Sequence, residues 1–127
     1  MRLLARGSVV LVDLEPTRGH EQAGARPAVV VSDPDVAADQ RYPLVCIVPI
    51  TATPGERALY PKLGVGPSGL RKVSWALVDQ LHSVDKRRVQ RIYGAISTRE
   101  LEKIDAGLAL FLALPAPSAR DHPRSED

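Results

Sequence analysis

The sequence predicts a mainly β fold with α structure, in which one helix packs on a small curled antiparallel sheet or barrel. Short runs rich in valine, isoleucine and leucine alternate with proline and glycine up to residue 96, a pattern typical of strands. Apolar residues then recur every three or four positions, which is typical of an amphipathic helix. With 127 residues, 44% of them hydrophobic, the chain is expected to form one compact domain over residues 1–114.

Five segments are predicted as strands from their composition, and a sixth is a weaker candidate. The expected strands cover residues 9–14, 27–32, 43–51, 72–81 and 89–96, with the weaker one at 57–63. Along the fourth of these segments, Val73, Trp75 and Leu77 fall on one side of the pleat, because side chains alternate along a strand. The apolar neighbours of Trp75 predict that its ring is buried in the core.

The helix is predicted to begin after Ser97. The stretch STRE at 97–100 has the form of a capping box, in which the Ser97 hydroxyl and the Glu100 carboxylate satisfy each other's backbone amides. The apolar stripe that should cover the sheet consists of Leu101, Ile104, Leu108, Phe111 and Leu112. Residues 115–127 contain three prolines and no large apolar residue, so we expect a disordered tail there.

Charge and composition restrict the functional classes without choosing among them. The 17 basic residues exceed the 15 acidic ones by two, which permits an anionic partner but does not require one. The only cysteine, Cys46, lies in an apolar run, and no apolar run approaches the roughly 20 residues of a membrane-spanning helix. We therefore expect a soluble cytoplasmic protein with no membrane partner. The histidines at 20, 82 and 122 are scattered, so neither a metal site nor a cofactor is expected.

The segment between Leu14 and Pro27 is too long for a tight hairpin and predicts a working loop. Its glycines allow sharp reversals, and its polar side chains supply hydrogen-bond donors, acceptors and charge. Because a following proline disfavours helical torsions, Arg26 should be extended at the entrance of the next strand. On composition alone, the alternative is that Glu21 and Arg26 simply form an ion pair that closes the loop.

The same loop reads GHEQAGARP at 19–27 and resembles the motif of the MazF/PemK family of toxin ribonucleases. Further similarity lies in PIT at 49–51, in VDQLHSVDKRRV at 78–89 and in the terminal amphipathic helix, so that the resemblance spans roughly residues 6–114. It implies an SH3-like antiparallel β-barrel that forms a homodimer and cleaves single-stranded RNA without a metal. It also implies a cognate antitoxin whose flexible acidic C-terminal segment blocks the RNA groove.

The resemblance assigns roles to individual residues. Arg26 is expected to be the principal catalytic residue and Thr51 its companion, with Glu21 as the carboxylate that assists proton transfer. The planar guanidinium suits stabilisation of a phosphorane, whereas a neutral arginine acting as a base is vanishingly rare. His20 and Gln22 are candidate substrate contacts in the loop.

The run DKRRVQR at 85–91 predicts a basic patch in which Lys86 and Arg87 bind RNA phosphates or an acidic antitoxin segment. A solvated turn is the alternative for this run. Because the chain has few aromatic residues, base recognition should depend more on hydrogen bonds than on broad stacking.

Two other functions are compatible with a barrel of this size. The first is a toxin that binds and poisons a topoisomerase, which would not need the pair of Arg26 and Thr51. The second is an inactive barrel that serves as a binding module. Incubation with labelled single-stranded RNA in a chelator separates both alternatives from a ribonuclease.

Overall fold

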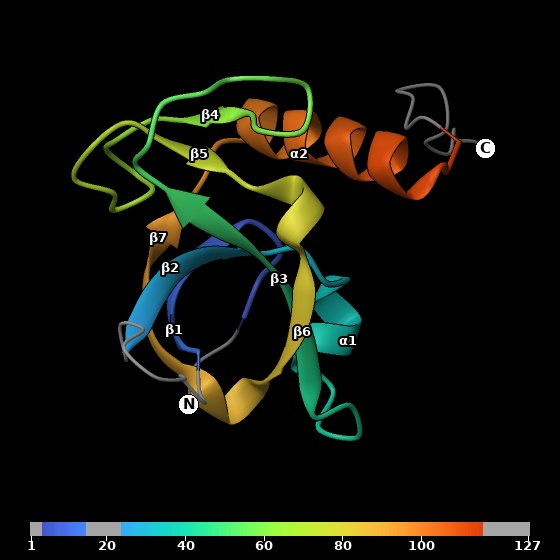
Figure 1. Cartoon of the computed structure of the whole chain (residues 1–127). Coiled ribbons are helices and arrows are strands. Elements are labelled where there is room, and N and C mark those ends of the chain that lie inside the picture. Colours follow the sequence, from blue (N-terminus) through green and yellow to red (C-terminus); the bar gives the residue numbers. More distant parts are fainter. Residues whose placement is uncertain (1–3, 15–23, 116–127) are drawn as a thin grey trace, which may run out of the picture.

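The computed structural model describes residues 4–14 and 24–115, and it confirms a curled antiparallel sheet with a C-terminal helix (Figure 1). The strands are β1 (Ser8–Asp13), β2 (Ala25–Val30), β3 (Leu44–Thr51), β4 (Lys62–Leu63), β5 (Ser74–Ala76), β6 (His82–Asp85) and β7 (Val89–Ala95). The helices are α1 (Pro34–Ala38) and α2 (Thr98–Leu112), and two 3-10 turns are η1 (Val78–Gln80) and η2 (Lys86–Arg88). No helix in this described part is long and apolar enough to cross a membrane. Apart from Pro115, the predicted tail lies outside the described residues.

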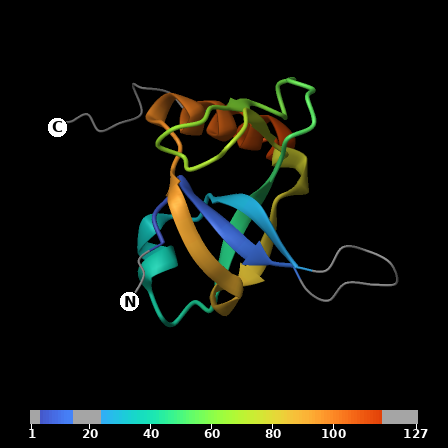
Figure 2. The same cartoon turned by 90° about the vertical axis from the view of Figure 1, so that its left-hand side faces the viewer.

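The strand order is β4-β5-β3-β2-β1-β7, with β6 also paired to β3, and all the pairs are antiparallel. The chain curls so that β1, β2, β3, β6 and β7 surround an interior, while α2 lies across the side formed by β4 and β5 (Figures 1 and 2). One end of β3 therefore pairs with β5, and the rest of the same edge pairs with β6.

Both faces of the central strands are buried, which explains why these strands read as nearly continuous apolar runs. Along β1, Val9 contributes to the core under α2, whereas Val10 and Val12 contribute to the core inside the curl. The core under α2 also contains Val29, Val48, Ile50, Leu63, Val78 and Ile104. The inner core also contains Ala28, Val30, Val45, Ile47, Val84 and Val89. The two cores hold the strand ends, where the candidate site lies, in fixed positions.

The capping box of α2 is confirmed. The Ser97 hydroxyl accepts a hydrogen bond from the Glu100 amide at 3.1 Å, and the Ser97 amide donates to the Glu100 carboxylate at 2.9 Å. The other oxygen of that carboxylate accepts from the Gly64 amide at 2.7 Å, so the helix start also anchors the segment after β4.

The predicted apolar stripe of α2 is correct in its first half and wrong at its end. Ile104 is fully buried, but Phe111 and Leu112 are each 46% exposed. The C-terminal turns extend beyond the edge of the sheet (Figure 1). The helix α2 instead approaches the segment before β4 closely at Gly107, where an added Cβ would lie 3.1 Å from the Ala58 carbonyl oxygen.

The predicted strand at 72–81 is wrong in extent, because β5 covers only Ser74–Ala76 and is followed by η1 and then by β6. Ala76 lies opposite Ile50, and His82 lies opposite Ile47. The chain therefore uses six residues to advance three positions along β3, and the excess residues form the η1 turn. The strand β6 was not predicted.

The predicted burial of Trp75 is also wrong. Ser74 and Ala76 occupy the buried side of β5, Val73 is 42% exposed, and Trp75 is only partly buried. The side of β5 that faces the core under α2 therefore carries small residues, and the large ring of Trp75 lies on the opposite side, which it shares with Thr51.

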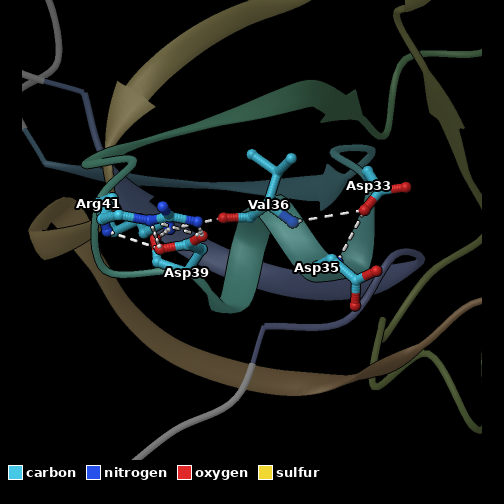
Figure 3. A network of polar contacts seen from close by, with 6 residues as sticks. Asp33, Asp35, Val36, Asp39 and Arg41 are labelled. Carbon is cyan, nitrogen blue, oxygen red and sulfur yellow. Dashed lines mark hydrogen bonds and ion pairs between the residues drawn. The ribbon is translucent and has the colours of Figure 1, made fainter.

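Two further segments differ from the prediction. The weak candidate at 57–63 contributes only β4 and an isolated bridge between Arg57 and Tyr60, since Pro61 has no amide to continue a ladder. The helix α1 was not predicted, because five residues carry too little periodicity. Its start is nevertheless readable in the sequence: Asp33 accepts hydrogen bonds from the amides of Asp35 and Val36 at 2.8 and 3.4 Å, ahead of a proline in the first turn (Figure 3).

Candidate active site

Arg26 is the second residue of β2, which begins at Ala25, so it is extended at the start of this strand as predicted. It pairs with Val12 of β1, whose side chain belongs to the inner core. Arg26 is exposed, and its guanidinium has no hydrogen-bond or ion-pair partner among residues 4–14 and 24–115. The sheet therefore fixes its backbone and leaves its side chain at the surface.

The register between β2 and β3 brings Arg26 and Thr51 to the same edge of the sheet. Ala28 lies opposite Pro49, which is the last recorded pair of this ladder. Continuing the register by two positions aligns Arg26 with Thr51. Residues opposite each other in an antiparallel pair point to the same face, so these two predicted catalytic side chains share a face.

Thr51 ends β3 and is half-buried. Its hydroxyl oxygen accepts a hydrogen bond from the Thr53 amide at 3.1 Å. Because the amide occupies the oxygen as an acceptor, the hydroxyl hydrogen remains available for donation to a ligand. This arrangement suits donation to a phosphate oxygen.

Thr51 also belongs to a row of side chains that extends from β3 onto β5 and β4, on the side of β3 opposite β2. Its cross-strand partner is Trp75 of β5, and Trp75 in turn lies opposite Lys62 of β4. The side chains of directly opposed residues lie on one face, with their Cβ atoms about 5 Å apart. An arginine, a threonine, a tryptophan and a lysine are thus aligned across four neighbouring strands.

A pocket of about 330 Å³ opens beside Thr51. Its walls include Thr51, Thr53, Arg57, Tyr60, Trp75 and Leu77. The Tyr60 hydroxyl donates to the Asp79 carboxylate at 2.8 Å, and this bond raises the pKa of Tyr60. Tyr60 therefore stays protonated and fixed at neutral pH.

Two buried polar atoms near this pocket have no hydrogen-bond partner among the described residues, namely the indole nitrogen of Trp75 and one carboxylate oxygen of Asp79. Leaving a buried donor unpaired costs about 1–3 kcal/mol.

The predicted phosphate contacts Lys86 and Arg87 are both bound within the fold. The Lys86 ammonium donates to the carbonyl oxygens of Val36 and Asp39, at 3.0 Å each, and so ties η2 to the end of α1. Asp39 also pairs with Arg41 in the network around α1 (Figure 3).

Arg87 forms a two-point ion pair with Asp85, at 3.0 and 2.9 Å. The hydrogen bonds from Arg87 lower the pKa of Asp85 to about 2, so this carboxylate is charged at neutral pH. The Arg87 side chain is nevertheless 90% exposed. A hollow of about 400 Å³ lies next to the pair and is lined by Asp13, Asp85, Arg87, Arg88 and Gln90, so both signs of charge meet there.

The remaining predicted site residues, His20, Glu21 and Gln22, lie outside the described residues. The assisting role of Glu21 therefore stays a prediction, and so does the alternative ion pair between Glu21 and Arg26. Sequence reasoning missed Trp75, Arg57 and Tyr60 as site residues. No local motif marks them, because only the pairing of β3, β4 and β5 brings them next to Thr51.

Comparison with known proteins adds independent evidence. The family model described as PemK-like, MazF-like toxin of type II toxin-antitoxin system matches residues 5–112. Endoribonuclease MazF9 of Mycobacterium tuberculosis is 33% identical over 118 residues, which are 88% of this chain and 98% of that protein.

Solved structures agree with this likeness. An endoribonuclease in complex with its cognate antitoxin, from a mycobacterial species, is 25% identical with a TM-score of 0.69, and the match covers 92% of this chain and 100% of the other. A MazE-MazF structure from Deinococcus radiodurans has a TM-score of 0.76 at 24% identity, with 91% and 100% covered. The second likeness bears on the fold alone.

Proposed function

The chain belongs to the PemK-like, MazF-like toxin family of type II toxin-antitoxin systems, as its loop motif predicted, and on this premise we propose that it is an endoribonuclease toxin that cleaves single-stranded RNA. The proposed reaction is attack of a ribose 2′-hydroxyl on the adjacent phosphate. A bond forms between the 2′-oxygen and phosphorus, and the bond from phosphorus to the 5′-oxygen breaks. The products are a 2′,3′-cyclic phosphate and a 5′-hydroxyl, and the reaction requires no metal.

The observation that carries this proposal is the alignment of Arg26 with Thr51 at the edge of the sheet. Five N–H donors in a planar fork match the oxygens of a phosphorane, and they act where negative charge develops in the transition state. The Thr51 hydroxyl, already held by the Thr53 amide, donates to a second oxygen. These two groups stabilise charge without transferring a proton.

Two proton transfers complete the reaction. One group accepts the proton of the 2′-hydroxyl, and another supplies a proton to the departing 5′-oxygen. Glu21 is the candidate carboxylate for the first transfer, because an arginine with an ordinary pKa is almost never neutral. Arg26 then serves as an electrostatic catalyst rather than as the base.

The protein is proposed to act as a homodimer, with single-stranded RNA and the antitoxin's acidic C-terminal segment as competing ligands of a shared groove. A relative of known structure is in complex with its cognate antitoxin, which supports a similar partner for this chain. Exposed cationic side chains along the row, including Arg26 and Lys62, suit an anionic segment of either kind. Sedimentation at micromolar concentration is expected to give about twice the chain mass.

End-group analysis tests the chemistry directly. Total RNA incubated with the protein in excess EDTA should yield fragments with 2′,3′-cyclic phosphate and 5′-hydroxyl ends. A requirement for added magnesium, or fragments bearing 5′-phosphates, would contradict the proposed mechanism. Absence of any cleavage would leave the nonenzymatic alternatives, a topoisomerase poison or a binding module.

A further inference from the structure

Trp75 occupies a position that packing alone does not explain. It is the only tryptophan of the chain, it lies on the side of β5 that faces away from the core under α2, and it is only partly buried. The buried side of the same strand is filled by Ser74 and Ala76. The indole N–H is buried and has no hydrogen-bond partner in the described part of the chain, which is an unfavourable arrangement for a residue that served packing alone.

The position of Trp75 places it next to the proposed reaction centre. Its direct cross-strand partner is Thr51, and neighbouring strands lie about 4.8 Å apart. A phosphate held by Thr51 therefore brings the attached nucleoside within reach of the indole ring. On the far side of Trp75, Lys62 extends the row and suits the next phosphate of the same strand.

The pocket beside this row combines the groups that recognise a nucleobase. Trp75 and Leu77 supply apolar surface, and Thr53 supplies a hydroxyl. Arg57 contributes a guanidinium with no ion-pair partner among the described residues. The backbone bridge between Arg57 and Tyr60, with the Tyr60 amide donating at 2.8 Å, holds this arginine at the rim.

We propose that this pocket is a nucleobase subsite that selects a guanine adjoining the scissile phosphate, with Trp75 stacking on the base and Arg57 donating to its edge. The inference rests on the proposed ribonuclease function. Base recognition in single-stranded RNA commonly combines aromatic stacking with hydrogen bonds to the exposed edge. Guanine is favoured because its O6 and N7 acceptors match the two parallel donors of an arginine. A phosphate alone would gain nothing from the indole ring.

The single tryptophan makes the subsite directly measurable. Cleavage sites are first mapped on total RNA, and a heptanucleotide of the mapped sequence is then made with a 2′-deoxy nucleotide at the attacking ribose, so that it binds without being cut. Binding should quench the fluorescence of Trp75. Replacement of the guanine by an abasic residue should abolish the quenching and weaken binding about tenfold, the typical loss for one stacked base.

Variants separate stacking from edge recognition. Trp75→Leu should raise KM about tenfold, and in this variant the abasic replacement should change the affinity very little. Trp75→Phe should retain most of the affinity. Substitution of 7-deazaguanine, which lacks the N7 acceptor, should weaken binding to the wild type but not to Arg57→Gln. The exposed Arg71, outside the pocket, provides the matched control, Arg71→Gln. Thermal melting identifies variants that fail to fold.

The outcomes distinguish this inference from the function on which it rests. A wild-type protein that cuts no RNA in EDTA defeats the ribonuclease proposal itself. A wild-type protein that cuts RNA, but has no guanine next to its mapped cleavage sites, defeats the guanine subsite. Unchanged Trp75 fluorescence on binding, or an equal effect of 7-deazaguanine on Arg57→Gln and on the wild type, also defeats it.

Discussion

Replacement of Arg26 by lysine separates the contribution of the planar guanidinium from the contribution of its positive charge. The variant keeps a cation at the edge of the sheet but loses the planar fork of donors. Because Arg26 is exposed, the substitution should change the free energy of unfolding by no more than about 0.5 kcal/mol. Loss of such a donor set in the transition state costs on the order of a hundredfold in rate, or about 2.7 kcal/mol.

The measurement is single-turnover cleavage of a mapped RNA, together with RNA affinity and thermal melting. We expect near-normal affinity and melting with a rate reduced at least a hundredfold. Arg91→Lys is the matched control, since Arg91 is an exposed arginine on β7, opposite Leu11. If Arg26 only closes the loop through Glu21, lysine preserves that contact and the rate. Near-normal cleavage by the folded variant would remove Arg26 from the catalytic assignment.

Three further predictions concern the frame of the site. Gly94→Ala should strongly destabilise the fold in urea titration, because an added Cβ would lie 2.1 Å from the Pro67 carbonyl oxygen; an unchanged midpoint would contradict this close approach. Ser97→Ala should lower the free energy of unfolding by about 1 kcal/mol through loss of the helix cap, and a loss below 0.3 kcal/mol would argue against the capping role. Arg87→Ala should return the pKa of Asp85, followed by NMR, from about 2 towards its usual value. Since the pKa of Asp85 is lowered in the folded protein, the stabilisation from its pairing with Arg87 is present above about pH 4 and is lost as the pH falls towards 2. A pKa of Asp85 in the variant equal to that in the wild type would refute the pairing.

The parts of the fold that could be predicted are those encoded by local pattern. The capping box at Ser97 and the apolar runs of β1, β2 and β3 each require only neighbouring residues, and all of them are found close to where they were expected. The division of 72–81 could not be predicted. It depends on how many residues of β3 are available for pairing, which is a property of a distant segment.

The same distinction applies to the site. The loop motif and the PIT stretch predict Arg26 and Thr51 as site residues without any knowledge of geometry, because each belongs to a contiguous pattern. The environment of Trp75 was misjudged because its neighbours in sequence are apolar. Which side of a three-residue strand faces the core is set by the strands beside it, and here Ser74 and Ala76 occupy the side that faces the core under α2.

Pro27 links the loop motif to the end of the ladder between β2 and β3. The Val31 amide donates to the Cys46 carbonyl oxygen at 3.0 Å, which fixes the alternation of hydrogen-bonded pairs between β2 and β3. In this register, Pro27 lies opposite Ile50 at the next hydrogen-bonded position, one residue beyond the end of the ladder at Ala28 and Pro49. Proline has no amide hydrogen for that bond, so the ladder stops one step before Arg26 and Thr51. The proline of the motif therefore both restricts Arg26 to extended torsions and ends the ladder between β2 and β3 before the two predicted catalytic side chains.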